Sequence, residues 1–99
     1  MSAGAALLYA EFTALSGHEE EVSALLARLA HDVRAEPGNV AFVPTRRPGR
    51  DGDFFVWEEY ADQAAFQAHI GSAHSRAFNE ALAPLVVGGA STLSWLEPL

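Results

Sequence analysis

The chain of 99 residues contains no cysteine and no lysine, and each absence excludes a class of function. Without cysteine there is no disulfide, no thiolate metal ligand and no thiol nucleophile. Without lysine, six basic residues face thirteen acidic ones, which gives a net charge of −7. We expect no nucleic-acid partner, because neutralising phosphates requires a basic face.

Long apolar runs are also missing. The longest uncharged apolar stretches are about six residues, far short of a membrane span, and no basic segment leads into an apolar core at the N-terminus. We therefore expect no membrane partner and a cytoplasmic location. No linker or internal repeat divides the sequence, so residues 1–99 are expected to form a single domain.

Apolar side chains are abundant, at 49% of the sequence, and their spacing predicts the secondary structure. Strands are predicted at about 6–13, 40–45, 54–60 and 91–96, with a turn-rich connection, RRPGRDGD, between the second and third. One helix is predicted at about 17–35, and a second helical region is interrupted at residues 71–72. This β-α-β-β-α-β order predicts an α+β, ferredoxin-like fold: a four-stranded antiparallel sheet with the helices on one face.

Local signals mark the helix ends. Ser16 and Glu19 fit a capping box at the start of the first helix. The sequence Glu36-Pro37-Gly38 should end that helix, because Pro restricts the residue before it and Gly tolerates a left-handed turn. Asp62 and Ser72 are expected to cap the two halves of the second helical region.

The third strand is apolar on both sides. Because side chains alternate along a strand, its two faces carry Phe54, Val56, Glu58 and Tyr60 on one side and Phe55, Trp57 and Glu59 on the other. Helices cover one face of a ferredoxin-like sheet, so the other face should be polar, and it is not. We therefore expect a second copy of the chain to cover it in a two-fold homodimer. The alternative is a monomer with a few exposed aromatics.

Two histidines flank the interruption in the segment HIGSAHSRAF. On a continuous helix their spacing of five residues would place them about 140° apart. With no cysteine and no nearby carboxylate at ligand spacing, we expect no metal site. The interruption lets His69 and His74 both face a pocket above the sheet, where imidazole suits general acid–base catalysis. The alternative is structural: His69 bonds a backbone group at the junction and His74 lies on the surface.

Glu58 lies in mid-strand on an otherwise apolar face. Burial raises the pKa of a carboxyl group unless a partner compensates, and a raised pKa suits a proton carrier. Alternatively, Arg76 pairs with Glu58, or the face is less buried than its pattern indicates.

These segments resemble the antibiotic biosynthesis monooxygenase (ABM) domain family. The likeness rests on SGHEEEVSALLARLAHDVRAEPGNVAF and on FFVWEEYADQAAFQAHIGSAHSRAF, where the third strand ends in an aromatic-Glu-x-aromatic pattern. It covers residues 6 to about 87 well, and the last strand by position only. The resemblance implies a homodimeric α+β barrel with a pocket between sheet and helices in each subunit.

The resemblance also implies a reaction. Several members oxidise phenolic or quinol-type aromatics with O2 and without flavin, metal or haem, by removing a proton so that the substrate anion itself reduces oxygen. For this chain it implies His69, His74 or Glu58 as the base and Arg76 as the group holding an anionic oxygen. Walls would come from Phe42, Phe54, Trp57, Tyr60 and Phe78. We therefore expect a cofactor-independent monooxygenase of a small aromatic substrate.

Other branches of the family keep the fold and change the task. One isomerises a small phosphorylated sugar-like signal by proton transfer without oxygen, and EPGNVAF and AFQAHIGSAHS are similar to it as well. A haem-degrading branch commonly has Asn on the first strand; residues 7–13 contain none, which disfavours that activity. A proton-transfer isomerase and a non-catalytic dimeric ligand-binding module remain as alternatives.

Overall fold

The computed structural model describes residues 4–99. In chain order its elements are β1 (Ala6–Thr13), α1 (Glu19–Arg34), β2 (Asn39–Arg47), β3 (Arg50–Tyr60), α2 (Gln63–Ile70), α3 (Ala73–Leu82), the short 3-10 turns η1 (Ala83–Leu85) and η2 (Val87–Gly89), and β4 (Thr92–Leu96). Within these residues no helix is long and apolar enough to cross a membrane.

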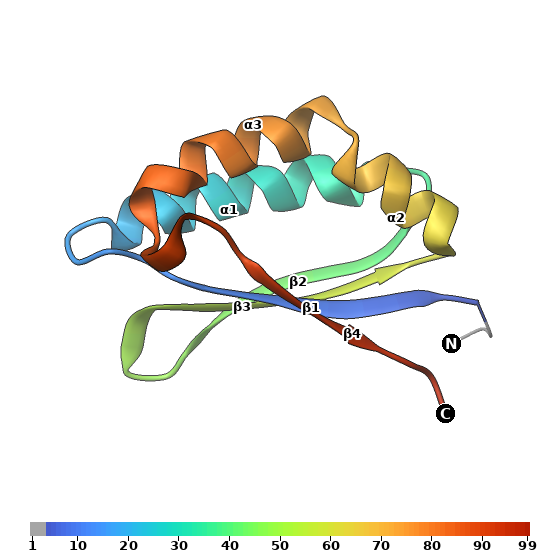
Figure 1. Cartoon of the computed structure of the whole chain (residues 1–99), viewed down its shortest axis with the longest axis horizontal. Coiled ribbons are helices and arrows are strands. Elements are labelled where there is room, and N and C mark those ends of the chain that lie inside the picture. The colour runs from blue at the N-terminus through green and yellow to red at the C-terminus, as the bar shows by residue number, and fades with distance from the viewer. Residues whose placement is uncertain (1–3) are drawn as a thin grey trace.

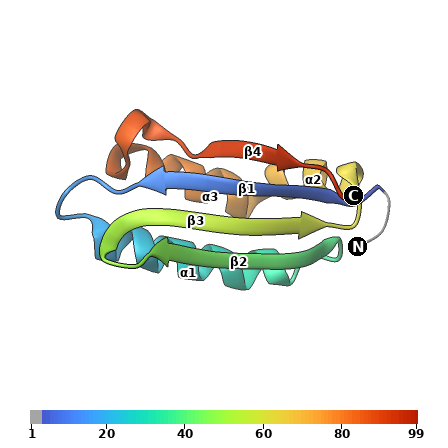
Figure 2. The same ribbon diagram turned by 90° about the horizontal axis from the view of Figure 1, so that it is seen from below.

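The strands form one antiparallel sheet in the order β2-β3-β1-β4, seen from its uncovered side in Figure 2. The helices all lie on the other side (Figure 1). The predicted ferredoxin-like arrangement is therefore confirmed, with the second helical region split into α2 and α3.

The connection between β2 and β3 is shorter than predicted. The turn-forming residues at positions 46–53 indicated a loop, but the strands run on to Arg47 and resume at Arg50, which leaves Pro48 and Gly49 as the turn. Gly49 has φ 75°, a left-handed conformation that glycine adopts readily. A two-residue hairpin of this kind keeps neighbouring strands paired to their ends, so the loop prediction was wrong.

Helix α1 begins without the predicted capping box. Its N-cap is His18, and no side chain caps the first turn, so the role predicted for Ser16 was wrong. Glu19 does reach back, but its Oε1 accepts a hydrogen bond from the Gly17 N–H at 3.0 Å rather than from Ser16.

The segment Glu36-Pro37-Gly38 follows the helix end as predicted, but the glycine is required for a different reason. Gly38 is not among the glycines with positive φ. A β-carbon at Gly38 would instead lie 2.4 Å from Ala65 Cβ, so this loop packs directly against the start of α2. The Gly38 carbonyl also accepts a hydrogen bond from the Ala61 N–H at 2.9 Å. The contact holds Glu36 close to α2.

The break between α2 and α3 is built as predicted. Asp62 Oδ1 accepts a hydrogen bond from the Ala65 N–H at 2.8 Å. Ser72 Oγ accepts one from the Ser75 N–H at 3.2 Å and donates one to the His69 carbonyl at 2.6 Å. Ser72 therefore ties the end of one short helix to the start of the next.

The two faces of the sheet differ in cover, although both are apolar. Phe54, Val56, Glu58 and Tyr60 of β3 are buried beneath the helices; alternation predicted that they share a face but not which face the helices cover. On the opposite face the ring of Phe55 stacks on Tyr9, with centroids 4.7 Å apart, and the neighbouring Val43 is 46% exposed. None of the helices within residues 4–99 covers this second face (Figure 1).

Candidate active site

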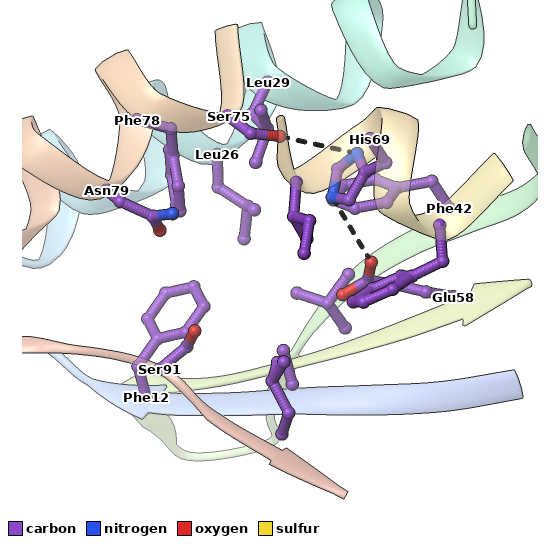
Figure 3. Close-up of a pocket in the computed structure, with 15 residues that line it drawn as sticks. Phe12, Leu26, Leu29, Phe42, Glu58, His69, Ser75, Phe78, Asn79 and Ser91 are labelled. Atoms are coloured by element: carbon purple, nitrogen blue, oxygen red, sulfur yellow. Dashed lines mark hydrogen bonds and ion pairs between the residues drawn. The ribbon is translucent and has the colours of Figure 1, made fainter. Parts of the chain in front are cut away.

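A hollow of about 90 Å³ lies between the sheet and the helices (Figure 3). Its walls are mostly apolar. Two of the lining side chains, Ile70 and Leu93, are each 44% exposed, so the hollow opens to solvent beside them. The polar groups in its lining are Glu58, His69, Ser75, Asn79 and Ser91.

His69 ends α2 with its two ring nitrogens in different surroundings. Nδ1 lies 2.9 Å from Glu36 Oε2 and 3.4 Å from Ser75 Oγ. A carboxylate only accepts hydrogen bonds, so Nδ1 carries the proton and Nε2 of the neutral ring keeps its lone pair. Nε2 is 3.8 Å from Glu58 Oε1, which is too long for a hydrogen bond. Glu58 therefore forms no hydrogen bond with His69 Nε2, although it lies on the same side as the Nε2 lone pair.

Glu36 joins the two histidines. The same oxygen, Oε2, that accepts from His69 lies 2.5 Å from His74 Nε2. The side chains of His69 and Glu36 are 10% and 13% exposed and that of His74 is 27% exposed. The cluster thus runs from the pocket wall at His69 to a second hollow on the outer side, which His74 lines.

This arrangement corrects two expectations. His69 Nδ1 bonds a carboxylate rather than a backbone group at the junction. The expectation that no carboxylate completes a ligand set with the two histidines was also wrong, because Glu36 of the α1–β2 loop, 33 positions before His69, lies beside both rings.

Glu36, His69 and His74 could in principle hold a metal ion, since their ligand atoms lie within 4.8 Å of one another. Around a tetrahedral zinc, ligand atoms sit about 3.3 Å apart, given Zn–N distances of ~2.0–2.1 Å. The separations of 2.9 and 2.5 Å are instead hydrogen-bond distances. We therefore describe the cluster as hydrogen-bonded.

Glu58 is buried beside His69, and Tyr60 is its hydrogen-bond partner. Burial raises the pKa of the Glu58 carboxyl above its usual 4.5, although the Tyr60 hydroxyl and the His69 ring oppose the rise. The Tyr60 hydroxyl donates to Glu58 Oε1 at 2.7 Å. Burial also raises the pKa of Tyr60 well above its usual range, so this residue remains a phenol that donates. The expected alternative partner, Arg76, does not contact Glu58; it donates to the Gly71 carbonyl at 2.9 Å on the surface.

The wall residues named from the sequence separate into two groups. Phe42 and Phe78 line the hollow. Phe54 is buried but lines a different hollow, with the Arg46 guanidinium 5.3 Å from its ring centre. Trp57 lies on the uncovered face of the sheet, opposite Tyr9 of β1. Tyr60 supports the site from behind, its ring centre 4.9 Å from that of His69.

Sequence reasoning missed Glu36, Ser75, Asn79 and Ser91. A signal existed for Glu36: a carboxylate just past a helix C-terminus faces the negative end of the helix dipole, so it requires a compensating partner. Ser75 and Asn79 are four positions apart on α3 and therefore share a helix face. Nothing in the sequence distinguished Ser91.

Comparison with known proteins agrees with this architecture. Residues 6–81 match the family described as antibiotic biosynthesis monooxygenase (ABM). No curated protein is significantly similar. A solved structure from Pseudomonas aeruginosa is 24% identical, with TM-score 0.90 and coverage of 100% of this chain and 98% of the other.

Two further solved structures carry functional descriptions. One, from Caulobacter crescentus, is named as a proposed antibiotic biosynthesis monooxygenase; it is 26% identical, with TM-score 0.88 and coverage of 98% and 92%. The other is a mutant form of SnoaB, a cofactor-independent oxygenase from Streptomyces nogalater; it is 21% identical, with TM-score 0.83 and coverage of 97% and 94%. The match over residues 6–81, together with the fold, shows that this chain belongs to the antibiotic biosynthesis monooxygenase family.

Proposed function

We propose that the protein is an oxygenase that oxidises a small, uncharged aromatic or quinol-type substrate with O2 and without a resident cofactor. One observation carries the proposal. Within an apolar hollow, His69 lines the wall with its Nδ1 anchored on Glu36 at 2.9 Å and its Nε2 turned toward the Glu58 side. An imidazole oriented by a carboxylate is the arrangement of a general base.

The reaction begins with proton transfer. His69 Nε2 takes a proton from a substrate hydroxyl, and the Glu36 carboxylate stabilises the imidazolium that forms. The electron-rich anion gives electrons to O2, a carbon–oxygen bond forms, and His69 returns the proton to the distal peroxide oxygen. Loss of water leaves a carbonyl.

The reaction balances without any other reductant. With hydroquinone as substrate, one oxygen atom of O2 becomes bonded to a ring carbon. The other oxygen atom leaves as water with two hydrogens of the substrate. The product is the hydroxylated para-benzoquinone, so the substrate itself supplies all four electrons that O2 accepts.

Glu58 supplies the complementary group. Burial raises the pKa of the Glu58 carboxyl, which favours the protonated form, and a protonated carboxyl can donate a hydrogen bond to an oxygen on which negative charge develops. Such a donor acts most strongly where water is excluded, and the apolar walls around Glu58 meet that condition.

The charge of the lining supports an uncharged substrate over a phosphorylated one. Phosphate binding normally uses Arg or Lys, and among residues 4–99 the hollow is lined by neither. Arg76, the residue expected to hold an anion, bonds Gly71 on the surface. An isomerase of a phosphorylated metabolite is therefore supported less well, although the same His69–Glu36 pair could transfer protons in an isomerase of an uncharged substrate.

The uncovered sheet face supports the proposal that the protein acts as a homodimer. It carries Tyr9, Val43, Phe55 and Trp57, none of which belongs to the core cluster formed within residues 4–99. An apolar sheet face of this kind is typical of an interface between copies. A second copy would bury it without altering the pocket, which opens on the opposite side.

Oxygen uptake with hydroquinone and substituted hydroquinones tests the activity. We expect uptake of one O2 per substrate, and about 10²-fold or greater loss of turnover in His69→Ala with an unchanged melting temperature. Turnover that continues at the same rate without oxygen would favour the isomerase. Binding without turnover, aerobically or anaerobically, would favour the ligand-binding module.

A further inference from the structure

The hollow has two chemically different ends. His69 and Glu58 lie at one end, while Asn79 and Ser91 lie at the other beside the Phe78 and Phe12 rings, with Leu26 between the two ends (Figure 3). The proposed reaction uses only the first end. The second therefore needs an explanation of its own.

Asn79 and Ser91 reach the hollow from different elements. Asn79 lies on α3, one turn beyond Ser75, on the face that meets the pocket. Ser91 directly precedes β4 and, like Leu93 two positions later, points to the helix side of the sheet. Ser91 is partly buried, whereas Asn79 lines the hollow while remaining exposed to solvent. Among the side-chain hydrogen bonds within residues 4–99, neither the Asn79 amide nor the Ser91 hydroxyl takes part in one. Two polar groups facing an otherwise apolar wall without protein partners are typical of ligand recognition.

The chemistry of this pair selects a kind of substrate atom. An amide and a hydroxyl each donate and accept hydrogen bonds, and neither is charged. They suit a neutral carbonyl oxygen, which accepts hydrogen bonds, or a hydroxyl group, which both accepts and donates them. They do not neutralise a carboxylate or a phosphate, and no basic residue of the described lining does so.

The volume limits the size of the substrate. An apolar cavity that binds benzene measures about 150 Å³, whereas this hollow measures about 90 Å³. Binding even one aromatic ring therefore requires the exposed side chains of Ile70 and Leu93 at the opening to move aside. A second fused ring would extend beyond the enclosed space.

We propose that Asn79 and Ser91 bind a substrate oxygen remote from the reacting hydroxyl, so that the enzyme selects one-ring, uncharged aromatics with oxygen substituents at opposite ends, of the hydroquinone type. This inference rests on the proposed function, since His69 defines the reacting end. Asn79 is then a specificity-determining residue that does not take part in proton transfer.

Binding measurements test the inference without requiring turnover. Hydroquinone and phenol are titrated anaerobically, with ascorbate present, into the wild type, Asn79→Leu and Ser91→Ala, and binding is followed by NMR shifts of the pocket residues. One net hydrogen bond is worth about a tenfold change in affinity. We expect hydroquinone to bind wild type about tenfold more tightly than phenol, and Asn79→Leu to abolish that preference while phenol affinity changes by less than about threefold. Gln67→Leu, which removes an exposed amide from α2, is the matched control and should keep the preference.

Several results would overturn the inference. An unchanged preference in Asn79→Leu would do so, as would equal binding of hydroquinone and phenol by the wild type, or the absence of pocket shifts with either probe. If Asn79→Leu melts below the wild type, Asn79→Ala provides the same test with a smaller side chain. The two proposals fail separately. If Asn79→Leu loses the preference for hydroquinone over phenol but the wild type takes up no oxygen, the oxygenase proposal is refuted and the proposed role of Asn79 in binding is retained. Oxygen uptake with an unchanged preference would do the reverse.

Discussion

Replacing Glu36 by Gln tests the central contact of the site. The variant keeps the shape of the side chain but removes the charge that faces both rings, at 2.9 Å from His69 Nδ1 and 2.5 Å from His74 Nε2. Hydrogen bonds to charged groups contribute about 1.5–3 kcal/mol. If the Glu36–His69 bond strengthens as the imidazolium forms, losing it should lower kcat by about 10- to 100-fold.

The separation of kcat from KM is informative here. Glu36 does not line the hollow, so substrate binding should change little and kcat and kcat/KM should fall together. Steady-state oxygen uptake with hydroquinone measures both. Glu80→Gln is the matched control, because it removes the same charge from an exposed position on α3 and should leave both constants unchanged.

The reasoning is refuted if folded Glu36→Gln retains kcat within about twofold of the wild type. An increase in KM alone would also contradict it, because the loop would then act on binding rather than on the base.

Three further predictions concern the rest of the molecule. Because burial raises the pKa of Glu58 above 4.5, the folded state binds more protons than the unfolded state between the two pKa values, and the free energy of unfolding should fall as pH rises through that interval. Urea unfolding at several pH values should show Glu58→Gln gaining stability relative to the wild type from about pH 4.5 upward; parallel profiles would contradict this. Trp57→Asp should give a 10.6 kDa particle in sedimentation at micromolar concentration, where we expect twice that mass for the wild type, because burying an unpaired carboxylate costs several kcal/mol. Val87→Asp, at an apolar position 60% exposed outside the sheet, should leave the mass unchanged. Gly38→Ala should lower the free energy of unfolding by about 1–3 kcal/mol, as overpacking does, because the new methyl group would lie 2.4 Å from Ala65 Cβ; Ala65→Gly in the same chain should restore part of the loss, and purely additive effects would argue against the contact.

Elements that depend on local pattern were predictable from the sequence. The strand at 6–13, the helix ending before Glu36 and the break capped by Ser72 all follow from spacing and capping chemistry. The hairpin was misread because turn residues report local preference, whereas pairing with the adjacent strand carries Arg47 and Arg50 into the sheet.

The site was only partly predictable, since it depends on contacts between distant segments. Alternation told us that Trp57 and Tyr60 lie on opposite faces but not which face meets the helices. The histidines were identified from their chemistry, yet the carboxylate that orients them comes from the α1–β2 loop, which was interpreted only as a helix end. That loop is placed by the close approach of Gly38 to Ala65, a packing fact absent from any local pattern.

The brevity of α2 has a mechanical consequence. Eight residues are too few for a helix to be stable through its own hydrogen bonds alone. The position of α2 therefore depends on the buried Phe66 side chain and on the hydrogen bond from Ser72 Oγ to the His69 carbonyl. This short helix carries both Ile70, at the opening of the hollow, and His69. If α2 moved as a unit to admit a substrate past Ile70, the His69 ring would move with it relative to Glu36. Entry of the substrate and orientation of the base are in this way coupled through one short helix.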